Sequence, residues 1–162
     1  MNFPILSSIT LLPAIGAAFI LFSKSEKNEN KNVINLSLFT AVINLILVIF
    51  LWHSFDKSVS GFQFVEEQNW ISGFIKFKFG IDGISILFIV LTAFITPICI
   101  ISCINSVKVR LKEFLIAILI LETFMIGVFC SLDLVVFYIF FEAGLIPMFL
   151  IIGIWGGPKR VY

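Results

Sequence analysis

Residues 133–155 read DLVVFYIFFEAGLIPMFLIIGIW, an almost wholly apolar run. At about 1.5 Å per residue, roughly 20 residues of helix cross a hydrocarbon core about 30 Å thick. Near the middle stands one carboxyl group, Glu142, and five residues later Pro147, which has no N–H to give to the carbonyl of Ala143. A charge at this depth costs roughly 2.5–3.5 kcal/mol. We therefore expect Glu142 to carry an ion or a proton. The alternative is a neutral acid that bonds to a neighbouring helix.

The surroundings of Glu142 on its own helix support a proton-carrying role. Tyr138 lies one turn before it, so a Tyr–Glu hydrogen bond is geometrically allowed. The rest of that face is apolar and consists of Val135, Ile139, Leu145, Ile146 and Phe149. Apolar surroundings favour the neutral form of a carboxyl group, which suits a group that picks up and releases protons.

The composition excludes an ordinary soluble domain. Hydrophobic residues make up 60% and charged residues 13% of the chain, against about 45–50% and about 25% in soluble domains. The net charge of +1 gives no indication of a nucleic-acid partner. The sequence predicts one all-α membrane domain over 1–162 in contact with the lipid bilayer. Its five expected transmembrane helices are residues 3–22, 33–52, 84–104, 114–130 and 134–155.

Few other side chains in the predicted spans suggest chemistry. Cys99, Cys103 and Cys130 all lie in apolar runs with no histidine near them, so we expect packing residues and no metal site. His53 falls at the end of a span and is expected at the membrane interface. Asn44 falls inside a span, where a hydrogen bond between helices is the usual role of an amide. The sequence has no glycine-rich nucleotide loop, flavin site or iron–sulfur cysteine cluster, so we expect no cofactor.

Residues 53–83 form the one sizeable region outside the predicted spans. Apolar residues alternate with lysines over 75–79, and a similar alternation occurs over 62–64, with Gly73 available for a turn. This period of two predicts a short β-hairpin on the membrane surface. Asp82, which follows it, is more readily interpreted as a helix N-cap than as a functional acid.

A second carboxyl group, Glu122, lies in the predicted fourth span. The turn that follows centres on Leu132, and Glu122 and Glu142 are each ten residues from it. Both acids are therefore expected roughly 15 Å from the same membrane surface. The sequence leaves open whether they face each other. Glu122 is a candidate second proton site, with a purely structural role equally open.

Basic residues predict the orientation of the chain. With the N-terminus outside, the inner loops hold eight of them, and the outer loops hold Lys57, Lys76 and Lys78. The positive-inside rule favours this arrangement and places residues 53–83 in the periplasm or the intermembrane space. The eight inner residues are Lys24, Lys27, Lys31, Lys108, Arg110, Lys112, Lys159 and Arg160.

Three runs resemble a known family. FYIFFEAGLIPMFLIIGIWGG (137–157), FQFVEEQNWI (62–71) and FGIDGISILF (79–88) are similar to the M-type antiporter-like subunit of proton-pumping NADH:quinone oxidoreductase, respiratory complex I. Its mitochondrial counterpart is NADH dehydrogenase subunit 4. The resemblance extends from about Phe62 to the end and is only general before it.

The resemblance implies a membrane-arm subunit that translocates protons while quinone is reduced elsewhere in the complex. Its partners would be other membrane-arm subunits, which the hairpin touches, in a bacterial or mitochondrial inner membrane. The chain would be part of an enzyme without a redox site of its own. Glu142 matches the family's fifth-helix glutamate, which pairs with a lysine on a later helix. Family members have more helices, arranged in inverted repeats, so the chain is expected to be a fragment, a split reading frame or a truncated product.

Three alternatives remain at the level of sequence. The first is a subunit of a multi-component sodium/proton antiporter, although the FGIDGIS and WGG runs argue against it. The second is a structural membrane protein whose intramembrane acids are packing contacts. The third is a non-functional remnant.

Overall fold

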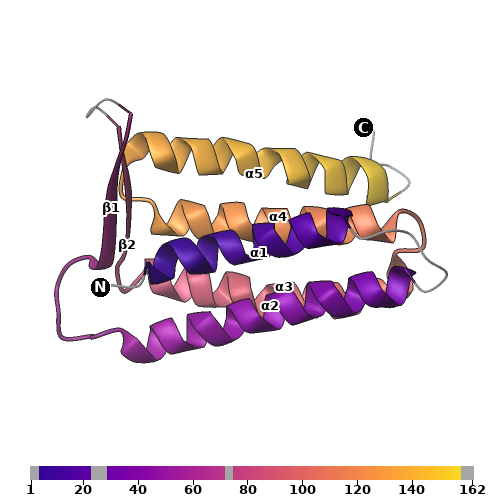
Figure 1. The fold of residues 1–162 in the computed structure, drawn as a ribbon, viewed down its shortest axis with the longest axis horizontal. Coiled ribbons are helices and arrows are strands. Elements are labelled where there is room, and N and C mark those ends of the chain that lie inside the picture. The colour runs from indigo at the N-terminus through magenta and orange to yellow at the C-terminus, as the bar shows by residue number, and fades with distance from the viewer. Residues whose placement is uncertain (1–3, 23–28, 72–74, 158–162) are drawn as a thin grey trace.

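Five helices and one β-hairpin make up the part of the chain that the computed structural model describes, residues 4–22, 29–71 and 75–157 (Figure 1). The helices run alongside one another, and the hairpin lies across one end of the bundle. The elements are α1 (Ile5–Phe22), α2 (Glu29–Ser54), β1 (Gln63–Ile71), β2 (Ile75–Ile81), α3 (Ser85–Ser106), α4 (Leu111–Cys130) and α5 (Leu134–Trp155).

The five predicted spans are confirmed as helices, each long and apolar enough to cross a membrane. The largest differences are at two helix starts, where α2 begins at Glu29 and α4 begins at Leu111. The residues added to α2 are polar, and those added to α4 are Leu111, which is buried in the core, followed by Lys112 and Glu113. Glu113 in the first turn of α4 pairs with Arg110, with Nε and Oε2 2.7 Å apart.

The bundle is arranged around α4, which contacts all four other helices. By contrast, α5 packs mainly on α4, and Val136 and Pro147 are its buried residues. Only 11% of the α5 span is buried, compared with 33% to 44% of each other span. Consequently α5 is the outermost helix, and most of its surface faces away from the bundle.

The core consists of two apolar clusters stacked along the bundle. One lies toward the hairpin and includes Leu6, Val48 and Ile126. The other lies toward the opposite end and includes Ala41 and Leu119. Between Ala41 and Val48 on α2, and between Leu119 and Ile126 on α4, a layer remains that belongs to neither cluster.

The predicted hairpin is confirmed, with β1 and β2 paired antiparallel from Gln63–Ile81 to Ile71–Ile75. The predicted turn at Gly73 lies outside the described residues. A register shift separates Gln63 from Glu66, and within it Phe64 takes a left-handed backbone conformation (φ 53°), as strand bulges often require.

Hydrogen bonds fasten the hairpin to α1 and to the turn between α4 and α5. The Glu66 carboxylate accepts hydrogen bonds from the backbone N–H of Leu6 (2.7 Å) and Ser7 (3.1 Å) and from the Ser7 hydroxyl. These donors are at the start of α1, where helix N–H groups have no partner within the helix. On the other side of the hairpin, the Leu132 N–H donates to the Lys78 carbonyl at 2.9 Å. The hairpin therefore joins α1 to the α4–α5 turn.

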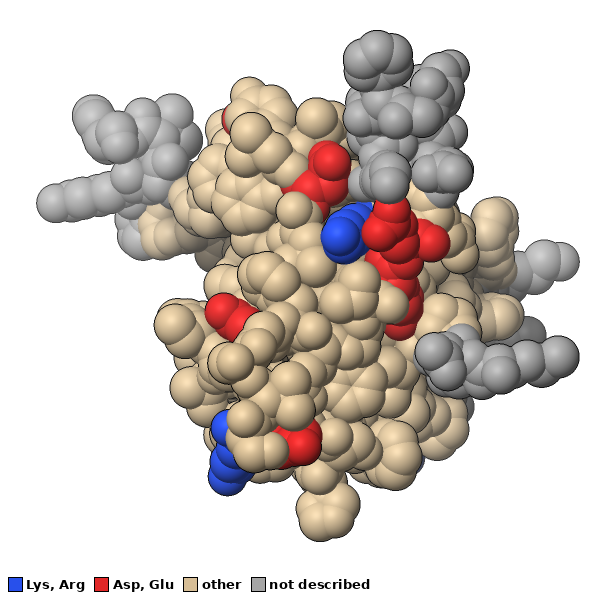
Figure 2. Space-filling model, turned by 90° about the vertical axis from the view of Figure 1, so that its left-hand side faces the viewer, with Lys and Arg blue, Asp and Glu red and all other residues tan. Residues whose placement is uncertain are grey.

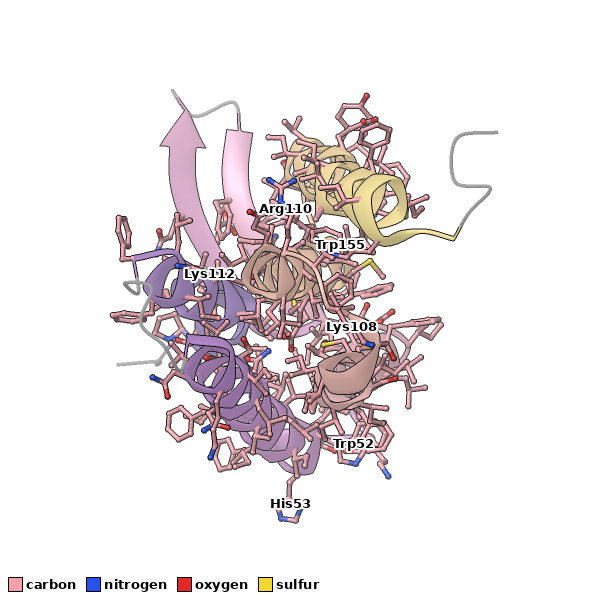
Figure 3. All side chains as sticks on the ribbon, turned by 90° about the vertical axis from the view of Figure 1, so that its right-hand side faces the viewer. Trp52, His53, Lys108, Arg110, Lys112 and Trp155 are labelled. Carbon is pink, nitrogen blue, oxygen red and sulfur yellow. The ribbon has the colours of Figure 1, made fainter. Side chains whose placement is uncertain are left out.

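The two ends of the bundle differ in charge. Figure 2 looks onto the hairpin end, where the described charged side chains are Asp56, Glu66, Glu67, Asp82, Asp133, Lys57 and Lys78. Figure 3 looks onto the opposite end, which carries Lys31, Lys108, Arg110, Lys112 and Glu113. Among the described side chains, acidic groups predominate at the hairpin end and basic groups at the other.

The packing of α4 on α5 depends on a close approach at Gly127. A Cβ placed there would overlap the ring of Phe140, with the ring Cγ only 2.7 Å away. Rotation of the ring about its Cβ–Cγ bond leaves Cγ in place, so it cannot relieve this overlap.

We expect Gly127→Ala to destabilise the bundle by roughly 1–3 kcal/mol, the usual effect of overpacking. The matched control is Gly153→Ala on α5, where an added Cβ meets nothing within 4 Å. Unfolding by a denaturing detergent, followed by circular dichroism, compares the two. Equal stability of both variants would mean that α4 and α5 do not approach this closely.

Candidate functional site

Glu122 lies inside the bundle, with 2% of its surface exposed. Its partner is Asn44 of α2, which is fully buried and whose Nδ2 donates a hydrogen bond to Glu122 Oε1 at 2.8 Å. The hydrogen bond between helices predicted for Asn44 is confirmed. The sequence did not identify its partner, although both residues lie near the middle of their spans.

The second oxygen of each side chain has no hydrogen-bond donor. Glu122 Oε2 and Asn44 Oδ1 are both buried and unpaired within the described part of the chain. Buried polar atoms are normally satisfied, and leaving one unpaired costs roughly 1–3 kcal/mol. The pair lies in the layer between the two apolar clusters, so it is a polar site within the hydrophobic core.

Glu142 lies on the face of α5 that points away from the other helices. It is exposed at the bundle surface and borders a shallow hollow lined by Ala143, Leu145, Ile146, Phe149 and Leu150. A side-chain hydrogen bond joins it to Tyr138, as the one-turn spacing allowed. The apolar surroundings predicted for Glu142 are present, but within this chain they form an open face and do not enclose it.

Pro147 faces the other way. It is buried, and with Val136 it forms the side of α5 that packs on α4. The helix continues past it to Trp155, whose indole Nε1 donates to the Val109 carbonyl at 2.8 Å (Figure 3). The proline surface thus anchors α5 while the acid points outward.

The structure does not bring the two acids together. Glu122 is directed into the core toward α2, whereas Glu142 is on the side of α5 that faces away from the bundle. Between them lies the α4–α5 contact, where Phe124 and Phe140 pack edge to face with ring centroids 6.3 Å apart. The two carboxyl groups are therefore separate sites.

A cavity of about 260 Å³ lies between α3 and α4, and Glu122 forms part of its wall. Two hydroxyl groups, those of Thr92 and Thr96, also belong to the wall. The other lining residues are Phe88, Leu91, Ile95, Cys99, Ile118, Leu121, Met125 and Phe129. Leu91, Ile95 and Met125 are exposed, so the cavity opens on the side of the bundle. Sequence spacing gave no indication of it.

No cluster of metal ligands occurs within the residues that the structure describes. The three cysteines are free thiols; Cys103 and Cys130 are buried and contribute to the two apolar clusters. His53 is exposed in the last turn of α2, at the hairpin end.

Asp82 acts as a helix cap. Its carboxylate accepts hydrogen bonds from the N–H groups of Ser85 (2.7 Å) and Ile84 (3.2 Å), as predicted. The Ile86 N–H also reaches the Asp82 carbonyl at 3.1 Å, so the helical bonding pattern starts at Asp82. The bonds from the Ser85 backbone and hydroxyl hold the pKa of Asp82 below its ordinary value of 3.8.

Most of the sequence matches a known protein family. A family model described as NADH-ubiquinone oxidoreductase chain 4, amino terminus, matches residues 8–128. NADH-quinone oxidoreductase subunit M of Rhodobacter capsulatus is 49% identical over 160 residues, 98% of this chain and 31% of the relative. NADH-ubiquinone oxidoreductase chain 4 of Marchantia polymorpha is 45% identical over 156 residues, 96% of this chain and 31% of the relative. The chain thus spans about a third of these relatives.

A solved structure has the same fold. A chain of the structure titled "Respiratory complex I from Thermus thermophilus with bound NADH" superposes with a TM-score of 0.74 at 27% identity. The match covers 96% of this chain and 30% of that one.

The Asp82 cap makes stability depend on pH in the acid range. A lowered folded pKa means that the carboxylate stabilises the chain above the unfolded value, near 3.8. This contribution is lost as the pH falls through the folded value. We expect Asp82→Ala to cost roughly 0.5–1 kcal/mol at neutral pH.

Asp82→Asn is the matched variant, because an amide caps a helix almost as well and does not titrate. It should keep most of the stability at neutral pH and lose less on acidification than the native chain. Detergent-induced unfolding at several pH values measures both effects. An acid dependence unchanged in Asp82→Asn would assign it to other groups.

Proposed function

Because the chain belongs to the family of NADH-ubiquinone oxidoreductase chain 4, we propose that it acts in the membrane arm of a proton-translocating NADH:quinone oxidoreductase. There it takes part in moving protons across the membrane, and the redox reaction that drives the movement takes place on other subunits. The names of the relatives favour this function over a sodium/proton antiporter subunit.

In this proposal Glu142 is the proton-carrying group. Its position in the bundle is the main observation in favour of this role. It is a carboxyl group near the middle of a span, on the side of α5 that the other four helices leave uncovered. An intramembrane acid at such a face is costly, so its presence points to a function. Tyr138, hydrogen-bonded to it one turn away, is the group that positions the carboxyl.

The chemistry follows from the surroundings of Glu142. An uncompensated charge near the middle of a span is costly, so in this proposal Glu142 keeps its proton while no cation is near. A cation brought next to the carboxyl favours the carboxylate instead, and the proton is released. The resemblance implies that a lysine from a later helix supplies this charge. Approach and withdrawal of the cation would then unload and reload Glu142.

The proposed orientation places the hairpin end outside and the basic end inside. The charge difference between the two ends supports it, because loops rich in Lys and Arg stay on the inner side of the membrane. The hairpin would then contact neighbouring membrane-arm subunits in the periplasm or the intermembrane space.

A cysteine at position 108 or 58 tests the orientation. We expect Lys108→Cys to be shielded from an impermeant thiol reagent added outside, and Ser58→Cys to react with it. Both positions are exposed at opposite ends of the bundle, so accessibility on the chain itself is matched. The reverse labelling pattern would overturn the proposed orientation.

Replacement of Glu142 tests the proton-carrying role in the assembled complex. Glu142→Gln keeps the size and hydrogen-bonding capacity of the side chain but cannot ionise. We expect the complex to assemble and proton pumping to fall by about 100-fold, the low end of what a positioned proton-transfer group contributes. Coupled NADH:quinone turnover should fall with it. Glu142→Asp should retain partial activity, because it can still ionise.

Glu113→Gln is the matched control, since Glu113 is an exposed glutamate at the end of the neighbouring helix α4. It should pump normally. Pumping into sealed vesicles is measured beside a native gel that reports assembly. Full pumping by an assembled Glu142→Gln complex would assign Glu142 a packing role only.

A further inference from the structure

The buried pair of Asn44 and Glu122 has an imbalance of donors and acceptors. The amide Nδ2 of Asn44 donates to Glu122 Oε1, and this is the hydrogen bond that the pair makes. The two remaining atoms, Glu122 Oε2 and Asn44 Oδ1, are buried and without a donor. If Glu122 were ionised, both of these atoms would be acceptors, and neither could satisfy the other.

No cation compensates a charge on Glu122 within the described residues. α1 contains no titratable side chain, and the residues of α2 with titratable side chains, Glu29, Lys31 and His53, lie near its two ends. On α3, Cys99 lines the same cavity and Cys103 bonds to the Ile100 carbonyl. On α5, Tyr138 and Glu142 are on the outward face. Lys78 of β2 lies at the hairpin end, where it pairs with Glu67.

We propose that Asn44 and Glu122 form a second proton-binding site, in which one proton on Glu122 Oε2 is donated to Asn44 Oδ1. The acid and the amide then pair through two hydrogen bonds in opposite directions, and both unpaired atoms are satisfied. The proton removes the negative charge from the layer between the two apolar clusters. This assignment does not rest on the role proposed for Glu142, from which the site is separated by the α4–α5 contact.

The unpaired atoms fit a proton better than a metal cation. Hard cations such as Ca²⁺ and Mg²⁺ take about six or more oxygen ligands. Here two oxygens are unpaired, and the hydroxyl hydrogens of Thr92 and Thr96 already go to the carbonyls of Phe88 (2.8 Å) and Thr92 (3.0 Å). One proton satisfies both unpaired atoms at once.

The cavity between α3 and α4 gives this proton a route. It has room for several water molecules, and Glu122 forms part of its wall. The oxygen atoms of Thr92 and Thr96 can still accept hydrogen bonds, so they offer water polar contacts beside the acid. The proton of this site would therefore exchange with water that enters between α3 and α4, and not through the face of α5 that carries Glu142.

Infrared spectroscopy of the chain in lipid bilayers tests the site, because a protonated carboxyl group has a C=O stretch distinct from that of a carboxylate. Glu142→Gln is used as the background, so that Glu122 is the remaining acid at mid-span. At neutral pH we expect a protonated-carboxyl band that Glu122→Gln abolishes. In Asn44→Leu the band should shift to a higher frequency or be lost, because the amide no longer bonds to the acid.

Glu113→Gln, made in the same background, is the control and should leave the band unchanged. Circular dichroism confirms that each variant is helical. If Glu122→Gln does not fold, Asn44→Leu decides, since it keeps the carboxyl and must change its band.

The route of the proton is tested by the rate at which the Glu122 carboxyl proton exchanges with deuterium. Met125→Trp places a larger side chain in the cavity wall, and slower exchange in this variant would support the cavity as the route. An unchanged exchange rate would exclude it. A missing band, or one that neither Glu122→Gln nor Asn44→Leu changes, would overturn the site. Because the measurement reports protonation and not pumping, it is independent of the result for Glu142.

Discussion

The helix α4 carries a carboxyl group into the centre of a bundle that is otherwise almost wholly apolar, and the surrounding helices have to accommodate it. Apolar packing gives helices in lipid little preference for one neighbour over another, because lipid tails are as apolar as leucine. A polar contact does discriminate. The hydrogen bond from Asn44 to Glu122 fixes which faces of α2 and α4 meet and at what depth. The two apolar clusters fill the space above and below this contact.

The outer helix is held differently. α5 has little buried surface, and its position depends on fixed points at its two ends. At the hairpin end, Asp133 caps the helix by accepting hydrogen bonds from the N–H groups of Val135 (2.9 Å) and Val136 (3.2 Å). At the other end, Trp155 bonds to Val109 and packs edge to face on Phe114 at 5.2 Å. The face that carries Glu142 stays uncovered as a result.

The sequence predicted the features that depend on local pattern. The five spans, the hairpin, the Asp82 cap and the Tyr138–Glu142 contact each follow from a period, a length or a spacing within one segment. Contacts between segments were not predicted, because apolar spans of similar composition give no indication of which faces meet. The Asn44–Glu122 bond joins residues 78 positions apart, and the sequence did not pair them. The long-range cap by Glu66 had no sequence signal at all, since acidic residues are common in surface strands.

The cap on α1 also has a consequence for biosynthesis. The helix is synthesised before the hairpin, and the carboxylate that satisfies its first N–H groups is 60 residues downstream of Leu6. At about 5–20 residues per second, ribosomes need roughly 3–12 s to reach that residue. During this interval the start of α1 depends on water or lipid headgroups for its hydrogen bonds. Docking of the hairpin therefore follows the synthesis of α1 by several seconds, and it joins α1 to the turn between α4 and α5.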